Sequence, residues 1–455
     1  MLSLFKHTKK QLNPGDVVIC DDAKQLCTKS RDTRVVMPVE SRMMNTLILG
    51  PAGSGKTTNI ILPMVAQDAQ NSDWGMTILS SKDELPLKAY LLAKENCREA
   101  IYFDPAKNDC PKFNPLSGLE VDVVENFVTT FKKLDPDSPQ FFKNLNEQLL
   151  RNAVKVLKRM DQAEGVEGKN ATLINLNRLL QNSSGQGREM VNKFSHICAS
   201  TEKEAADNRD ISSWFLNDYF SEGSKVYENT SGIRSQIAKL VDNEYLHSVL
   251  NPDFDKGERN EINFEECMAQ GTVICVSTAE RTLRDLSKYL ACFFTLAVST
   301  ALLRYRGYGE NRRSQALYID EFLNPALPCL RDILIHSKDL KVSLVMTAQS
   351  LSMLRVGGGR EKPLFVEILR CNSRNIILLP GITKADAESY AKYHFAREMP
   401  VSDLIFADYN NLHYCIWHNQ PETDGLALGR IRPLPAEISR KLEASAQEYK
   451  DSFSV

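Results

Sequence analysis

The sequence predicts an α/β fold in which a mainly parallel sheet carries an inserted all-α domain. A short apolar run at 45–49 is followed by a glycine-rich loop and then by a helix-like run from residue 58. Other short apolar runs, separated by helical patterns, lie before residue 105 and after residue 271, which is typical of a parallel sheet covered by helices. Between about 121 and 250, apolar residues instead repeat with the 3.6-residue period of helices.

Short apolar runs bounded by turn residues are the expected strands, and the helical patterns lie between them. From these patterns we expect a β-rich preface at 1–44, a nucleotide-binding domain at 45–120 and 251–435, an all-α insertion at 121–250 and a helical, solvated tail at 436–455. The expected strands are 16–20, 33–37, 45–49, 75–80, 100–104, 272–277, 315–320, 342–347, 375–379 and 413–417.

Composition is that of an ordinary globular protein. The chain has 455 residues, 42% hydrophobic and 25% charged, which is enough for about two or three domains. The net charge of −2 gives no global basic signal, so any contact with nucleic acid must come from a local patch.

The chain offers no clear membrane span, export signal or zinc spacing. The most apolar run, 289–303, is shorter than the ~18–20 residues that cross a bilayer and contains Thr and Ser, so we expect a buried helix there. The N-terminus lacks the apolar core of a signal peptide, which predicts a cytoplasmic protein. The 11 cysteines include no C-x-x-C pair, and the alternation at 413–418 favours a strand over a metal site.

The glycine-rich loop carries the strongest chemical signal. Residues 50–57 read Gly-Pro-Ala-Gly-Ser-Gly-Lys-Thr, the complete G-x-x-x-x-G-K-[ST] phosphate-binding loop, between a strand-like and a helix-like run. Its glycines let backbone N–H groups turn toward phosphate oxygens, and the helix N-terminus adds its positive dipole end. The expected nucleotide-binding residues are Gly50, Pro51, Ala52, Gly53, Ser54, Gly55, Lys56, Thr57 and Thr58.

A nucleotide loop of this kind needs a metal ligand and a base. We expect Lys56 to reach the β- and γ-phosphates of ATP and the Thr57 hydroxyl to ligate Mg²⁺. The apolar run 317–319 ends in two acids, of which we assign Asp320 to Mg²⁺ and Glu321 to the catalytic base. Two solvated acids at a strand end are the alternative, and the intact loop elsewhere in the chain favours the catalytic interpretation.

Two further roles in phosphoryl transfer have candidates. Gln349 follows the next expected strand and could sense the γ-phosphate or orient water. Many such ATPases also take a positive charge from the adjacent subunit. The candidates by position are Arg331, Lys338, Arg370 and Arg374, and the sequence does not choose among them.

These landmarks, in this order, resemble the conjugative coupling ATPases of type IV secretion systems, within the FtsK/HerA superfamily. The resemblance spans roughly 45–420. It rests on the loop with Ile-Ile-Leu-Pro at 60–63, on Tyr-Phe-Asp-Pro at 102–105 with Phe-Asn-Pro-Leu at 113–116, and on the helical stretch 141–157. It continues with Ile-Asp-Glu-Phe at 319–322, Gln-Ser-Leu-Ser-x-Leu at 349–354 and Asn-Ser-x-Asn at 372–375.

The resemblance implies a RecA-like motor domain that binds ATP and Mg²⁺ and works as a homo-hexamer around a DNA channel. It also implies that the helical domain faces the cytosol and receives a relaxase–DNA complex. The family usually begins with membrane-spanning helices, so we expect this chain to reach the inner face of a bacterial membrane through a partner protein.

Two other departures from the family concern single positions. The segment 80–84 reads Ser-Ser-Lys-Asp-Glu where the family often has an acid before Lys-Gly-Glu, and the family's arginine upstream of the glutamine strand falls on Lys338. Lysine lacks the planar fork of arginine. Two alternative functions therefore stay open: a soluble DNA translocase outside conjugation, and a nucleotide-switched substrate receptor or adaptor with little turnover.

Overall fold

The computed structural model describes residues 12–25, 34–305, 312–321, 327–351, 361–393, 414–419, 425–431 and 433–452. The chain divides into two compact units. The first comprises Met1–Asp104, Phe264–Arg281 and Ala301–Val455, and the second comprises Pro105–Asn263 and Thr282–Thr300.

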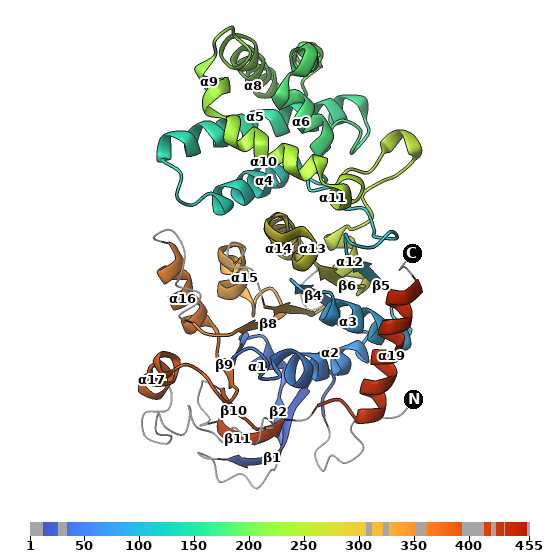
Figure 1. Ribbon diagram of the computed structural model, residues 1–455, viewed down its shortest axis with the longest axis vertical. Coiled ribbons are helices and arrows are strands. Elements are labelled where there is room, and N and C mark those ends of the chain that lie inside the picture. The colour runs from blue at the N-terminus through green and yellow to red at the C-terminus, as the bar shows by residue number, and fades with distance from the viewer. Residues whose placement is uncertain are drawn as a thin grey trace. The chain divides into compact units, whose positions relative to one another are not determined.

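In the part of the first unit that is described, one 11-stranded sheet forms the centre (Figure 1). Its order is β2 (Val35–Met37), β1 (Val17–Gln25), β11 (Gly425–Ile431), β10 (Tyr414–Asn419), β9 (Asn375–Leu378), β3 (Thr46–Leu49), β8 (Val342–Ala348), β7 (Gln315–Asp320), β4 (Gly75–Ser80), β6 (Val273–Ser277) and β5 (Ala100–Phe103).

The strands from β9 to β5 run parallel, and the remaining pairs are antiparallel. This confirms the expected α/β class with a mainly parallel sheet. Strands β3, β4, β6 and β7 are buried along their whole length, as in a sheet covered on both faces. Because parallel strands end at the same edge, the residues that follow β3, β4, β7 and β8 come together there.

The N-terminal strands differ from the expected separate preface. Strand β1 pairs antiparallel with β11, and β2 pairs with β1, so both extend the main sheet. Strand β11 is not among the strands expected from the sequence, because its run 425–431 mixes leucines with small and charged residues and shows no clear polar face. His413, part of the expected strand at 413–417, lies outside the described residues.

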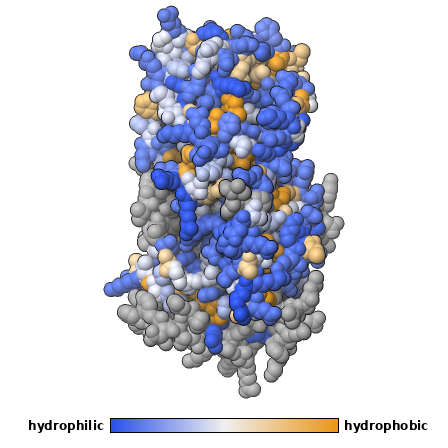
Figure 2. Space-filling model, turned by 45° about the vertical axis from the view of Figure 1, so that its right-hand side comes forward, coloured by the Kyte–Doolittle hydropathy of each residue, from blue (hydrophilic) through white to orange (hydrophobic). Residues whose placement is uncertain are grey.

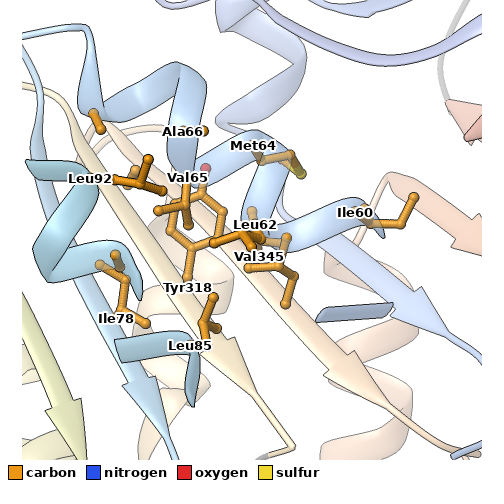
Figure 3. Packing of buried hydrophobic residues seen from close by; sticks show 14 of the residues in the cluster. Ile60, Leu62, Met64, Val65, Ala66, Ile78, Leu85, Leu92, Tyr318 and Val345 are labelled. Carbon is orange, nitrogen blue, oxygen red and sulfur yellow. The ribbon is translucent and has the colours of Figure 1, made fainter. Parts of the chain in front are cut away.

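Helices pack on the sheet through a continuous apolar core. Figure 3 shows Leu62, Val65 and Ala66 of α2 lying over Tyr318 of β7 and Val345 of β8. The helical elements of this unit are α1 (Val39–Arg42), η1 (Lys56–Ile61), α2 (Leu62–Ala69), α3 (Glu84–Glu95), α12 (Phe264–Gln270), η7 (Leu327–Leu330), α15 (Arg331–His336), α16 (Glu361–Asn372), α17 (Lys384–Tyr393) and α19 (Ala436–Ser452).

The C-terminal helix α19 is packed against the protein rather than solvated. Leu442 and Ala446 are buried in the same core, and the Tyr449 ring lies 6.0 Å from that of Tyr90 on α3. Lys450 forms a 2.6 Å ion pair with Asp83. The many charged residues of this segment suggested a solvated helix, but its apolar residues recur at helical spacing and form one buried face.

A buried ion pair joins helices α1 and α2, and a tyrosine of strand β7 contacts the same carboxylate. Arg42, on α1, places its two guanidinium nitrogens 2.8 and 2.6 Å from the carboxylate oxygens of Asp68 on α2. The Tyr318 hydroxyl donates to the same carboxylate at 2.5 Å, and the Arg42 guanidinium lies 4.3 Å from the centre of the Trp74 ring. All three polar side chains of this network are fully or almost fully buried.

The second unit is helical, as the 3.6-residue period predicts. Thr172 and Thr201 accept hydrogen bonds from backbone N–H groups three residues later, so each caps the start of a helix. Its helical elements within 105–263 are α4 (Glu120–Leu134), α5 (Gln140–Glu164), α6 (Leu173–Gln181), η2 (Ser183–Gly185), α7 (Gln186–Phe194), α8 (Glu202–Ser213), η3 (Trp214–Tyr219), α9 (Lys225–Asn229), α10 (Ser231–Asp242), α11 (Glu244–Val249) and η4 (Phe254–Lys256).

The apolar run at 289–303 belongs to a longer helical segment than the sequence indicated. The segment Glu280–Arg304 combines α13 (Glu280–Leu283), η5 (Arg284–Leu286) and α14 (Ser287–Arg304). By length and composition this segment of the described chain could cross a membrane, but 72% of its most apolar window is buried in the structure. Its Phe293 and Phe294 stack on Phe127 and Phe113, as expected of a core helix.

The molecular surface seen in Figure 2 is mostly hydrophilic, with separate small apolar areas. Among the described residues, the large apolar side chains that are exposed are Leu119, Val121, Phe141, Tyr245, Leu303 and Ile335. Scattered apolar residues of this kind are normal on a folded protein.

Candidate functional site

The glycine-rich loop connects β3 to η1 at the carboxyl edge of the sheet. Gly53 and Gly55 have φ angles of 78° and 84°, which side chains with a Cβ rarely adopt. A Cβ on Gly55 would lie 2.3 Å from Nδ2 of Asn59, so the Asn59 side chain would have to move to admit one. Both glycines are therefore required by the backbone, as the motif predicts.

Lys56 is held inside the loop. Its side chain is buried, and its ammonium group donates to the backbone oxygens of Gly50 at 2.7 Å and Pro51 at 2.9 Å. Burial lowers the pKa of the Lys56 ammonium, while the nearby carboxylates of Glu321 and Asp320 act in the opposite direction. The loop thus directs a positive charge toward the position that phosphates occupy in such a motif.

Asp320, the last residue of β7, joins the loop to the central strands. The Thr57 hydroxyl donates to its Oδ2 at 2.7 Å, and the Thr347 hydroxyl donates to its Oδ1 at 2.7 Å. Burial raises the pKa of the Asp320 carboxyl, and the two threonine hydrogen bonds partly offset that effect. Thr57 and Asp320 stand 263 positions apart in the sequence, yet the fold brings these two hard oxygen groups together.

Glu321 follows Asp320 in a strained conformation. Its φ angle is 44°, in the left-handed region that is costly for a residue with a Cβ. Its backbone N–H donates to the Thr347 hydroxyl at 2.9 Å, and its carboxylate forms an ion pair with Lys82. The Thr347 hydroxyl therefore contacts both residues, the carboxylate of Asp320 and the backbone of Glu321.

Gln349 lies just beyond β8 at the same edge and is half-buried. The next residue, Ser350, donates to the buried carboxylate of Asp386 at 2.6 Å, and Thr383 donates to the same carboxylate at 2.9 Å. This network attaches the segment after β8 to the start of α17. Ser352 and Leu354 of the Gln-Ser-Leu-Ser-x-Leu run, and Phe322 after Glu321, lie outside the described residues.

Two of the four candidate cations, Lys338 and Arg374, precede parallel strands and so lie at the opposite edge of the sheet. Arg331 begins α15, Lys338 precedes β8 by a few residues, and Arg374 immediately precedes β9. Arg370, on α16, is 3.5 Å from Glu367. Because β8 spans seven residues, Lys338 stands roughly 20 Å from the loop edge of its own sheet.

Lys82 and Thr347 are the site residues that the sequence analysis missed. Thr347 was included only as part of a strand, and the 80–84 segment was examined for an acid rather than for its lysine. The signal for Lys82 is its position two residues beyond β4, the strand that pairs with β7. A charged residue at that point reaches the same edge as Asp320.

The residues at this edge fit a nucleotide with a magnesium ion. The loop offers backbone N–H groups and a lysine for phosphates, and the Thr57 hydroxyl with the Asp320 carboxylate offers the hard oxygen ligands that Mg²⁺ prefers. Mg²⁺ takes its other ligands from water and phosphate oxygens.

Comparison with known proteins agrees with this arrangement. The family model described as type IV secretory system conjugative DNA transfer matches residues 8–387. No curated protein matches the chain.

Solved structures share the fold at low sequence identity. The bacterial conjugative coupling protein TrwBdeltaN70 has a TM-score of 0.59 at 14% identity, over 93% of this chain and 94% of its own. The plasmid coupling protein TrwB in complex with ADP and Mg²⁺ has a TM-score of 0.60 at 14% identity, over 92% and 94%. VirB4 of Thermoanaerobacter pseudethanolicus has a TM-score of 0.56 at 14% identity, over 94% and 99%. These likenesses confirm the expected fold class.

Proposed function

This chain belongs to the type IV secretory system conjugative DNA transfer family, and we propose that it is an ATP-hydrolysing coupling protein that moves DNA or a relaxase–DNA complex into a conjugation channel. The observation that carries the proposal is the 2.7 Å contact between Thr57 and Asp320 beside the buried Lys56. It supports a complete phosphate and metal site built from distant parts of the chain. The TrwB structure with ADP and Mg²⁺ supports the same ligands, because its fold is shared.

Each residue at the sheet edge has a defined part in this proposal. Lys56 and the loop N–H groups bind the phosphates, and Thr57 and Asp320 hold Mg²⁺, which when bound neutralises phosphate charge. Glu321 accepts a proton from the attacking water, from a position directly after Asp320 in a strained backbone conformation. Gln349 orients the water from the end of β8.

The proposal extends to assembly and partners. A cation roughly 20 Å from its own loop cannot reach the phosphates bound there, but it can serve the loop of an adjacent subunit. We therefore assign the chain to a homo-hexamer that encloses DNA, with Lys338 or Arg374 facing the next protomer. The helical unit receives the relaxase, and a membrane partner docks the ring on the cytoplasmic face.

DNA-stimulated ATP hydrolysis tests the proposed function. We expect the full-length chain to hydrolyse ATP, with a rate that rises several-fold on adding DNA and that depends on protein concentration as rings form. Lys56→Ala removes the phosphate contact and should abolish both the basal and the stimulated rate. Binding of ATP without turnover, at every protein concentration and with or without DNA, would instead favour a nucleotide-switched adaptor.

Thr57→Ala tests the proposed metal site. We expect the strengthening of ATP binding by Mg²⁺ to fall at least about tenfold, because even outer partners of metal ligands cost that much when removed. Calorimetric titration with ATP, in Mg²⁺ and in EDTA, measures the effect. Ser72→Ala is the control, since Ser72 is an exposed hydroxyl residue before β4, outside the proposed site, and the variant should leave the Mg²⁺ dependence unchanged. An equal loss with and without Mg²⁺ contradicts the assignment.

A further inference from the structure

Lys82 lies beside the proposed base Glu321 and has no part in the proposed phosphate, metal or proton-transfer roles. It stands two residues beyond Ser80, the last residue of β4, and Ser80 pairs with Asp320 across the parallel strands. The Lys82 ammonium forms an ion pair with the Glu321 carboxylate. The lysine side chain is 47% exposed and that of Glu321 is 22% exposed, so ligands in solution can reach the pair.

The backbone that carries Lys82 is fixed on both sides. The Lys82 N–H donates to the Ser80 hydroxyl at 3.2 Å, and the carbonyls of Ser80 and Ser81 each accept a backbone hydrogen bond of 3.0 Å from the segment after β6. Asp83 is held by Lys450 of α19. A fixed backbone with a long, half-exposed side chain lets the ammonium change partners while the loop stays in place.

Charge relations place Lys82 within reach of the phosphate loop. The Glu321 carboxylate raises and the Lys82 ammonium lowers the pKa of Lys56, so both charges lie near the phosphate loop. The Lys82 ammonium occupies the Glu321 carboxylate, so a water molecule has to compete with the lysine for that acceptor. A γ-phosphate bound at Lys56 brings more negative charge than one carboxylate and would compete for the second lysine.

We infer that Lys82 exchanges its ion pair with Glu321 for a contact with the γ-phosphate of ATP, and so frees the base only when a triphosphate is bound. The inference rests on the proposed nucleotide function. It makes Lys82 a residue that distinguishes ATP from ADP, because ADP has no γ-phosphate to take it from Glu321.

Lys82→Gln tests the exchange through nucleotide affinity rather than turnover. Titration with a non-hydrolysable ATP analogue and with ADP should show about tenfold weaker binding of the analogue and less than twofold change for ADP. Lys82→Arg should restore most of the preference, because it keeps the charge. Lys94→Gln, an exposed lysine on α3, is the matched control and should bind both nucleotides like wild type. Thermal unfolding of each variant checks that the fold is retained.

A second arm separates phosphate contact from mere packing. Glu321→Gln removes the ion-pair partner of Lys82, so the affinity for the ATP analogue should rise roughly threefold relative to that for ADP. Adding Lys82→Gln to this variant should abolish the increase. Equal weakening of analogue and ADP by Lys82→Gln overturns the inference, as does unchanged affinity for both. A wild-type chain that binds neither nucleotide overturns the proposed function and this inference together, whereas normal wild-type binding with no Lys82 effect overturns the inference alone.

Discussion

Glu321→Gln is expected to reduce ATP hydrolysis at least ~100-fold while ATP binding is retained. The amide keeps the size and most contacts of the glutamate but cannot accept a proton from water. The phosphate-binding groups are separate: Lys56 donates within the loop, and Thr57 contacts Asp320. Loss of chemistry without loss of affinity is therefore the expected signature, measured by steady-state phosphate release and by nucleotide titration.

Glu280→Gln provides the control for that experiment. Glu280 is an exposed acid whose backbone N–H donates to Ser81, close to the same sheet edge, but its carboxylate has no role in the proposed chemistry. Its hydrolysis rate should match wild type. Equal rates for wild type and Glu321→Gln would show that another group activates the water, and the assignment of the base would be wrong.

Asp68→Ala is expected to lower the free energy of unfolding by about 3–5 kcal/mol, because it leaves the Arg42 guanidinium buried without its partner. The same substitution removes the acceptor of the Tyr318 hydroxyl. Asp68 lies on the helix that continues from the phosphate loop, and Tyr318 lies two residues before Asp320. The network thus connects the two halves of the proposed site, and denaturant titration measures its contribution.

Two further variants show whether the loss of stability in Asp68→Ala comes from the unpaired charge. Asp73→Ala removes an exposed carboxylate a few residues away and should change the free energy of unfolding by less than about 0.5 kcal/mol. Arg42→Met combined with Asp68→Leu replaces the pair by apolar groups and should recover much of the stability. A double variant as unstable as Asp68→Ala would mean that the unpaired Tyr318 hydroxyl or the packing, rather than the unpaired Arg42 charge, causes the loss.

Local sequence patterns were sufficient to locate the phosphate loop and the two acids at the end of β7. The glycine positions follow from backbone conformation alone, and the loop stands between a buried strand and a helix that the sequence marks clearly. Asp320 could be placed at the same edge because parallel strands end together, once both strands had been identified. The helical unit followed from its 3.6-residue period.

Contacts between distant segments were not predictable from such patterns. Strand β1 pairs with β11, some 400 positions later, and no local feature of either run indicates which strand it pairs with. Lys82 reaches Glu321 only because β4 lies next to β7, an order that the chain sequence does not state. The apolar stripe of α19 does not by itself show that the helix is packed. Its burial could be recognised only from the fold, in which Leu442 joins the same core as residues of α3.

A crystal structure of Glu321→Gln with ATP and Mg²⁺ shows where the nucleotide and the metal ion bind. We expect a triphosphate whose β- and γ-phosphates contact Lys56, and a metal ion at about 2.0–2.1 Å from the Thr57 hydroxyl with Asp320 in its immediate surroundings. A nucleotide bound elsewhere on the chain, or a metal ion far from both Thr57 and Asp320, would contradict this expectation.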